Sequence, residues 1–211
     1  YLPKDISVET YLFGHSLGGL FALSWAHFIN QENTDGSLEK LLPKQVVVAD
    51  PIPSTKMGIS GPVGKAIKLT TRDDRYIDIQ GVGGDLTMPV AILHGDKDAI
   101  APKGEWKQWF PYIKTEDKKM YLSFSDIVGC PPMYANHEQA TQNLSFFPIF
   151  LQLTFLDGVG VENNLNWRYI WDALDRVVRY GENASQLTFD MGNWSNGESV
   201  RGISVFLPEL Q

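Results

Sequence analysis

Short apolar runs rich in β-branched residues alternate along this chain with longer segments whose apolar residues recur at helical spacing. The first pattern predicts strands and the second predicts helices. The expected strands cover 8–13, 45–49, 89–94 and 119–125, and the expected helices cover 17–30, 103–113, 138–156 and 164–180. Strands that alternate with helices are typical of a parallel sheet. We therefore expect an α/β fold with a mostly parallel sheet flanked by helices.

The segments between these elements contain more glycine, proline and polar residues. Residues 51–64 predict an irregular excursion, and 65–80 predict a short helix or irregular chain. The glycine cluster 81–84 lacks the following helix that a phosphate-binding loop needs, so we interpret it as a linker into the next strand. Near the C-terminus, 187–189 and 202–207 are β-prone and predict a small hairpin.

One glycine-rich motif carries most of the chemical information. The sequence GHSLGG at 14–19 follows a β-prone run and precedes an apolar helical segment. A strand, a G-x-S-x-G turn and a helix together predict a nucleophile elbow with Ser16 at its tip. We expect Gly14 and Gly18 to leave room for close approach of the backbone. The backbone N–H of Leu17 is the donor that we expect to face an oxyanion.

An aspartate follows the expected strand 89–94. Asp98 lies in a G-x-x-D-x-x-x-P loop, at the edge of the sheet where the carboxyl ends of parallel strands gather. It is the preferred acid for orienting a histidine. Asp50 is the alternative, because it directly follows the expected strand 45–49. Asp96 is interpreted as an ordinary loop residue.

Four histidines compete for the role of general base. His15 adjoins Ser16 in the motif and is expected to point away from its hydroxyl, His27 to pack on a helix, and His94 to be structural. His137 lies in a loop between the last expected strand and a helix, where a base could reach Ser16. A Cys130–His137 nucleophile pair stays a minor alternative.

These motifs resemble the α/β-hydrolase superfamily. The matching segments are GHSLGG at 14–19, HGDKDAIAP at 94–102 and NHEQA at 136–140, in the order serine, acid, histidine. The resemblance implies a catalytic triad of Ser16, Asp98 and His137, with Leu17 in the oxyanion hole. It also implies hydrolysis of a small-molecule carboxylic ester through an acyl-enzyme. Amide, thioester or acyl-transfer chemistry on the same triad is the alternative.

The resemblance also implies strands that the chain does not supply. In this family four strands precede the elbow strand, whereas only seven residues precede Val8. We therefore expect the first four strands to be missing, together with the loop that carries the second oxyanion donor. The elbow strand would then be an open edge that an N-terminal segment or another chain completes. A catalytically incomplete fragment that acts as a binding module is the non-enzymatic alternative.

Composition narrows the class of protein. The chain has 211 residues, 43% hydrophobic and 20% charged, which is ordinary for a globular domain. Its net charge of −7 and lack of a basic patch argue against nucleic-acid binding. The apolar run 144–156 is too short to span a membrane, so a soluble protein is expected, with the compartment open and secretion included.

The sequence also leads to expectations about cofactors and about the division of the chain. A single cysteine excludes an internal disulfide framework, and no metal-binding motif is present, so no cofactor or metal is expected. Residues 1–156 are expected to form the catalytic domain from the nucleophile elbow onward. Residues 157–211 are expected to form a C-terminal extension that packs on the same domain and covers part of the mouth of the site.

Overall fold

The computed structural model describes residues 8–56, 76–129, 132–141 and 160–206. Its centre is a five-stranded sheet in the order β1-β2-β3-β4-β5. The strands are β1 (Tyr11–His15), β2 (Gln45–Ala49), β3 (Val90–Gly95), β4 (Lys118–Ser123) and β5 (Ser204–Phe206). The first four are parallel, and β5 is antiparallel to β4. The prediction of an α/β fold with a mostly parallel sheet is confirmed.

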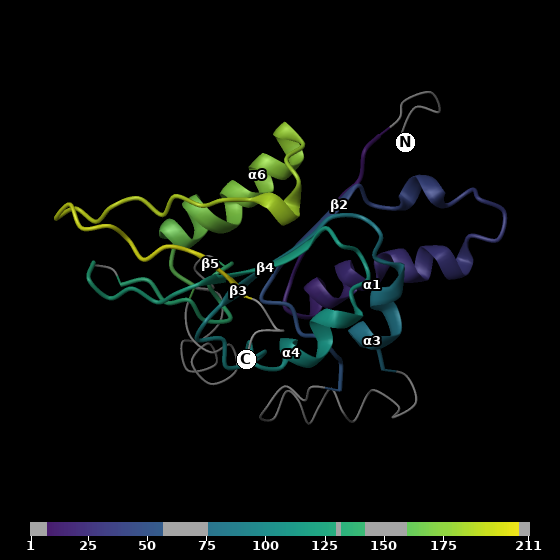
Figure 1. Ribbon diagram of the computed structural model, residues 1–211, viewed down its shortest axis with the longest axis horizontal. Helices are drawn as coiled ribbons and strands as arrows, with labels where there is room; N and C mark the ends of the chain where they lie inside the picture. The colour runs from purple at the N-terminus through teal and green to yellow at the C-terminus, as the bar shows by residue number, and fades with distance from the viewer. Residues whose placement is uncertain (1–7, 57–75, 130–131, 142–159, 207–211) are drawn as a thin grey trace.

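Helices cover both faces of the sheet. The α-helices are α1 (Leu17–Glu32), α3 (Ile79–Val82), α4 (Trp106–Trp109) and α6 (Trp171–Tyr180). Shorter helical turns are η1 (Glu39–Leu41), η2 (Gly83–Asp85), η3 (Phe110–Tyr112), the π-helical η4 (Asn166–Ile170) and η5 (Ala184–Gln186). Helices α1, α3 and α4 lie on one side of the sheet and α6 lies on the other (Figure 1).

Alternation along the central strands explains this arrangement. Val46 and Val48 of β2 belong to a core shared with α1, α3 and α4, whereas Val47 belongs to a core shared with α6. Neighbouring side chains on a strand point to opposite faces, so a strand covered on both faces must be apolar throughout. All residues of β2 and β3 are buried accordingly.

The parallel register brings the carboxyl ends of the strands to one edge. His15 pairs with Ala49, Ala49 with Leu93, and Gly95 with Ser123. Residues that directly follow β1, β2 and β3 therefore converge there, which is the edge where sites form in parallel sheets.

Several predicted boundaries differ from the structure. The strand expected over 8–13 runs over Tyr11–His15 instead, and the helix expected over 103–113 is reduced to α4 and η3. Pro111 lies within η3, and proline cannot donate the backbone hydrogen bond that an α-helix would need there. The strands expected over 45–49, 89–94 and 119–125 correspond to β2, β3 and β4 within one or two residues.

The glycine cluster 81–84 is not the plain linker that was predicted. It lies in α3 and η2, because the Asp78 carboxylate accepts a hydrogen bond from the Gly81 N–H and caps a short helix. Most of the segment 65–80 that precedes it lies outside the described residues.

The predicted C-terminal hairpin is wrong. Ser204–Phe206 pairs with β4 instead of with 187–189, because this pairing gives β4 a second neighbour and places Phe206 against the core of the α1 face. The helix expected over 164–180 is confirmed as η4 followed by α6. Of the helix expected over 138–156, residues 138–140 form a turn and 142–156 lie outside the described residues.

The second core, on the α6 face, draws on two distant parts of the chain. Leu165, Tyr169 and Ala173 pack there against Ala91 and Leu93 of β3.

None of the helices in the part of the chain that the structure describes has the length and apolar character needed to cross a bilayer.

Candidate active site

Ser16 occupies the tight turn between β1 and α1. Its backbone has φ 56° and ψ −123°, a left-handed conformation that is uncommon for a residue with a side chain. Its N–H donates to the carbonyl of Ala49, which ties the turn to the end of β2. Such strain persists only when the surrounding structure enforces it, and it is found at functional sites.

The two motif glycines play different parts in this turn. A side chain on Gly14 would overlap the carbonyl group of Gly18, so the close approach expected at Gly14 is present. A side chain on Gly18 would meet only open space, so the same expectation was wrong for Gly18. The helix backbone at Gly18 is what approaches Gly14.

Ser16, His137 and Asp98 lie in one hydrogen-bonded chain. The Oγ of Ser16 is 2.7 Å from Nε2 of His137, and Nδ1 of His137 is 2.9 Å from Oδ2 of Asp98. The other oxygen of Asp98 accepts hydrogen bonds from the N–H groups of Ile100 and Ala101. The sequence-predicted serine, base and acid are thus brought together, with the carboxylate fixed on both oxygens.

The surroundings of His137 and Asp98 shift their pKa values in opposite directions. Burial alone would lower the pKa of His137, but the hydrogen bond to Asp98 and its negative charge outweigh burial and raise that pKa. Burial alone would raise the pKa of Asp98, but its bond to His137 and the nearby imidazoles lower it. An imidazolium formed at His137 is therefore stabilised beside an ionised Asp98.

The alternative acid, Asp50, is close but has different partners. Its carboxyl accepts hydrogen bonds from the N–H of Gly95 at 2.8 Å and from Nε2 of Gln139 at 2.9 and 3.0 Å. It is completely buried, and burial followed by the negative charge of Asp98 raises its pKa well above the ordinary value. In this structure Asp98 is the carboxylate in hydrogen-bond contact with His137.

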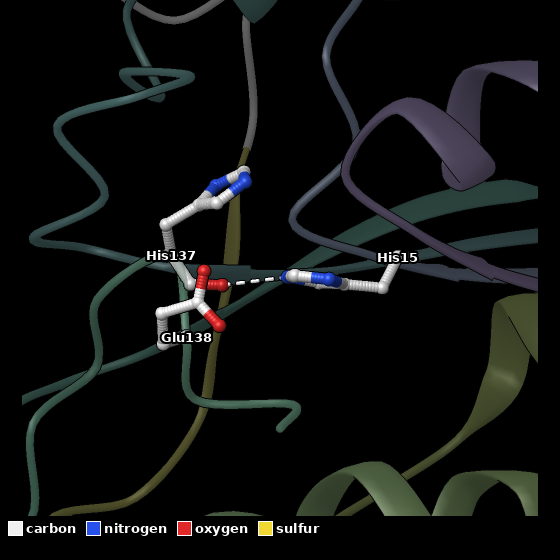
Figure 2. Close-up of side chains that lie close together, drawn as sticks. All are labelled: His15, His137 and Glu138. Atoms are coloured by element: carbon white, nitrogen blue, oxygen red, sulfur yellow. Dashed lines mark hydrogen bonds between the residues drawn. The ribbon is translucent and has the colours of Figure 1, made fainter. Parts of the chain in front are cut away.

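His15 lies against the histidine loop, a contact that sequence reasoning missed. Its Nε2 donates to the backbone carbonyl of His137 at 2.7 Å, with Glu138 beside it (Figure 2). The rings of His15 and His137 have centroids 5.0 Å apart. Burial lowers the pKa of His15 to about 4, so the ring stays neutral. Its position next to Ser16 in the motif was the signal that could have indicated this contact.

Of the remaining histidines, His27 contacts an aspartate and His94 is buried between two aspartates. Nδ1 of His27 lies 2.7 Å from a carboxylate oxygen of Asp85 and so joins α1 to η2, more than the packing role that was predicted. His94 is completely buried between Asp50 and Asp98. Cys130, the minor candidate nucleophile, lies outside the described residues.

Leu17 begins α1 directly after Ser16. The first N–H groups of a helix have no partner within the helix, and they lie at the positive end of its dipole. The N–H groups of Gly19 and Leu20 donate to the carbonyl of Ser16, and the N–H of Leu17, the first of the helix, is the candidate donor for a developing negative charge.

Two groups of described residues bring metal-ligating atoms within 4.8 Å of one another. They are His15, His137 and Glu138 in one group and Asp50, His94 and Asp98 in the other. Both ring nitrogens of His137 and Nε2 of His15 already have hydrogen-bond partners. The first group thus matches a hydrogen-bonded site better than a metal centre. The second group contains Asp98, whose carboxylate is already hydrogen-bonded to His137.

No family model matches the chain, and no curated protein matches it. Among solved structures, it is similar to monoacylglycerol lipase from Paleococcus ferrophilus, with 20% identity over 55% of this chain and 59% of that one, and a TM-score of 0.35. It is also similar to Est1E from Butyrivibrio proteoclasticus, with 20% identity over 56% of this chain and 52% of that one, and a TM-score of 0.38.

A ferulic-acid-bound structure of Est1E is similar at 21% identity, with the same TM-score of 0.38. The chain spans between about half and three fifths of the length of these solved structures. Because all three TM-scores are below 0.5, we base the proposed function on the geometry of the site.

Proposed function

We propose that this chain carries the active site of a serine hydrolase of the α/β-hydrolase type that cleaves carboxylic esters. The observation that carries the proposal is the hydrogen-bonded chain from the Ser16 hydroxyl through His137 to Asp98. A hydroxyl is a weak nucleophile until a base accepts its proton, and a carboxylate behind the base stabilises the charge that results. The left-handed backbone of Ser16 supports its role at the tip of a nucleophile elbow.

The reaction proceeds in two acyl transfers. Oγ of Ser16 attacks the carbonyl carbon of the ester while Nε2 of His137 takes the hydroxyl proton. The tetrahedral intermediate collapses, His137 returns the proton to the leaving alkoxide, and an alcohol departs from the acyl-enzyme. Water then repeats the attack with His137 as base, and the carboxylic acid leaves as Ser16 regains its proton.

The oxyanion of each intermediate needs preorganised donors. We assign one of them to the backbone N–H of Leu17, because it is the first helical N–H after the nucleophile. The second donor is proposed to come from a further segment that completes the sheet. Among the described strands β1 pairs only with β2, so its other edge is open to such a segment.

The surface along β1 and α1 supports this second proposal. Phe13 on β1 has 46% of its surface exposed although its strand forms the edge of a buried sheet. On α1, Phe21, Trp25 and Phe28 are exposed at spacings that place them on one side of the helix. Phe13 lies on the open strand itself, and the three side chains of α1 face away from the core; we propose that a further parallel strand and its helix cover such exposed apolar groups.

The test of the proposed reaction is covalent labelling of Ser16 with a fluorophosphonate. The wild-type protein is expected to gain the mass of one probe and to hydrolyse short-chain p-nitrophenyl esters, and Ser16→Ala is expected to do neither. Ser24→Ala is the matched control, because Ser24 is a buried serine on α1, the helix that follows Ser16, and its hydroxyl donates to the carbonyl of Phe21.

The outcomes separate the candidate functions. Labelling with ester turnover supports the esterase, whereas labelling with faster turnover of an amide, a thioester or an acyl acceptor would assign the other chemistry of the same triad. A folded wild-type protein that does not react with the fluorophosphonate would contradict the hydrolase proposal for this chain. It would favour the alternative function, a binding module.

A further inference from the structure

One imidazole in this site has no role in the reaction derived above. His94 is the next-to-last residue of β3 and is completely buried. By hydrogen-bond geometry neither of its ring nitrogens has a partner among the described residues, although an interaction with the backbone of Ala101 acts to raise the pKa of the ring. Buried polar atoms are nearly always satisfied, so two orphaned nitrogens on one ring need an explanation.

Each of these nitrogens faces a carboxyl group. Nδ1 of His94 is 3.6 Å from Oδ1 of Asp50, and Nε2 is 3.7 Å from Oδ2 of Asp98. Both distances exceed a normal N–H···O bond by about half an ångström. All three side chains are shielded from solvent, so the ring lies between two carboxyl groups in a buried pocket directly behind the proposed catalytic acid.

The protonation states of His94, Asp50 and Asp98 decide which hydrogen bonds can form among them. A neutral imidazole has one N–H donor and one acceptor nitrogen, so it can donate to only one of the two carboxyls. If both carboxyls were ionised, the second would face the lone pair of the ring. If one carboxyl is protonated, its O–H faces the acceptor nitrogen, and an approach of about half an ångström on each side would pair all three groups.

Asp50 is the carboxyl that is suited to hold this proton. Burial and then the charge of Asp98 raise the pKa of Asp50, and burial lowers the pKa of His94 to about 4. Asp98 is instead ionised beside His137. The other titratable groups that act on the pocket are Lys103, which opposes charge on His94, and Tyr169, whose hydroxyl accepts the backbone N–H of His94.

We propose that His94 and Asp50 are positioning residues that extend the triad, with a neutral Asp50 donating to His94 and His94 donating to Asp98. This inference rests on the proposed function, because Asp98 matters only if His137 is the base. Oδ2 of Asp98 then receives N–H groups from His137 and from His94, while Oδ1 receives the two backbone N–H groups already described. The orientation of Asp98, and through it that of His137, is fixed by this arrangement.

Gln139 completes the arrangement from the histidine loop. Its Nε2 donates to both oxygens of Asp50, and its Oε1 accepts from the hydroxyl of Ser123 at 2.5 Å. Because Gln139 follows His137 by two residues, the same contacts anchor the loop that carries the base. The pocket thus links the ends of β2, β3 and β4 to that loop.

The test compares four variants by steady-state kinetics on a p-nitrophenyl ester. His94→Phe keeps the ring volume but removes both nitrogens, and is expected to lower kcat about 10- to 100-fold with little change in KM. His94→Gln restores a donor and an acceptor and is expected to recover most of that loss. Asp98→Asn is expected to lose at least about 100-fold. Asp50→Asn cannot both accept from Gly95 and Gln139 and donate to His94 through one atom, so it is expected to lower kcat, but by less than Asp98→Asn does.

Nitrogen-15 NMR of the histidine rings provides a readout that does not require turnover. A neutral His94 ring with a single N–H, retained in Ser16→Ala, is the expected result. Wild-type kcat in His94→Phe, Asp50→Asn as slow as Asp98→Asn, or a doubly protonated His94 at neutral pH would each overturn the proposal. Loss of labelling at Ser16 in the wild type would instead contradict the proposed function and leave the NMR result standing.

Discussion

At the scale of single residues, the site depends on the charge states of two neighbouring groups. In the proposed reaction, His137 must be neutral to accept the proton of Ser16, and Asp98 must be ionised to stabilise the imidazolium that forms. The raised pKa of His137 means that the ring is protonated, and so inactive as a base, up to a higher pH than an isolated histidine would be. The pH dependence of activity therefore reports the contact between these two residues.

The first prediction follows from the raised pKa of His137. As pH falls through the pKa of His137, kcat/KM is expected to fall, with a midpoint above the ordinary histidine value of 6.5. Asp98→Asn removes the charge that raises this pKa, so the midpoint is expected to move to lower pH as the overall rate drops. The measurement is kcat/KM for a p-nitrophenyl ester from acidic to alkaline pH.

His27→Gln is the control for this profile. His27 contacts Asp85 instead of the residues around Ser16, so the substitution is expected to leave the midpoint unchanged. A wild-type midpoint below 6.5, or one that His27→Gln shifts as far as Asp98→Asn does, would contradict the assignment of His137 as the base.

At the scale of elements, the junction of β1 and α1 decides how Ser16 is presented. The strand ends at His15 and the helix begins at Leu17, so one residue makes the whole turn. This is feasible only because Gly14 allows the backbone of the helix to pass close to the strand. The turn then holds the hydroxyl at the edge of the sheet where His137 can reach it.

The second prediction compares alanine at the two motif glycines. Gly14→Ala would force the methyl group into the carbonyl of Gly18, so we expect a loss of about 1–3 kcal/mol in the free energy of unfolding. Gly18→Ala meets open space inside a helix and is expected to leave stability unchanged or to raise it by up to about 1 kcal/mol. Urea unfolding of both variants measures the difference.

The rate of fluorophosphonate labelling at Ser16 compares the reactivity of the serine in the same two variants. The fluorophosphonate is expected to react more slowly with Gly14→Ala and at the wild-type rate with Gly18→Ala, because only the first displaces the turn. Equal stability and equal labelling of the two variants would show that the close approach at Gly14 does not control the geometry of the site.

At the scale of the whole molecule, the sheet has one face covered by α1, α3 and α4 and the other by α6 (Figure 1). The described residues from Leu165 to Val200 contribute much of the second core. The division into a catalytic part at 1–156 and an extension at 157–211 stays a prediction, as does the cover that the extension would give to the mouth of the site.

The third prediction concerns the apolar surface along β1 and α1. The double variant with Phe21→Gln and Phe28→Gln is expected to bind less of the dye ANS and to associate less at high concentration than the wild type. Its melting temperature is expected to change little, because both side chains are exposed. Dye fluorescence and sedimentation velocity measure the two effects.

Val178→Gln with Tyr180→Gln on α6 is the matched control, since these side chains are at least as exposed but belong to the helix on the opposite face of the sheet. The control is expected to behave as the wild type. If both double variants reduced dye binding equally, the exposed side chains of α1 would bind apolar groups no better than those of α6. That result would contradict the proposal that a further strand and helix cover this surface.

Much of this protein could be read from local sequence patterns. The apolar runs predicted β2, β3 and β4 closely, because a strand buried on both faces must be apolar along its whole length. The motif around Ser16 and the aspartate after β3 could be interpreted because their spacing reflects a turn and a strand end. The rule that parallel strands end at one edge then predicted that Ser16 and Asp98 would converge.

Tertiary structure decided what depends on contacts between distant residues. The partner of Ser204–Phe206, the contact of His15 with the backbone of His137, and the enclosure of His94 each join segments far apart in the chain. No local pattern encodes these contacts, because each depends on which element packs beside which. The sequence by itself thus determined the residue types and the order of the elements, and the fold decided which acid faces His137 and what lies behind that acid.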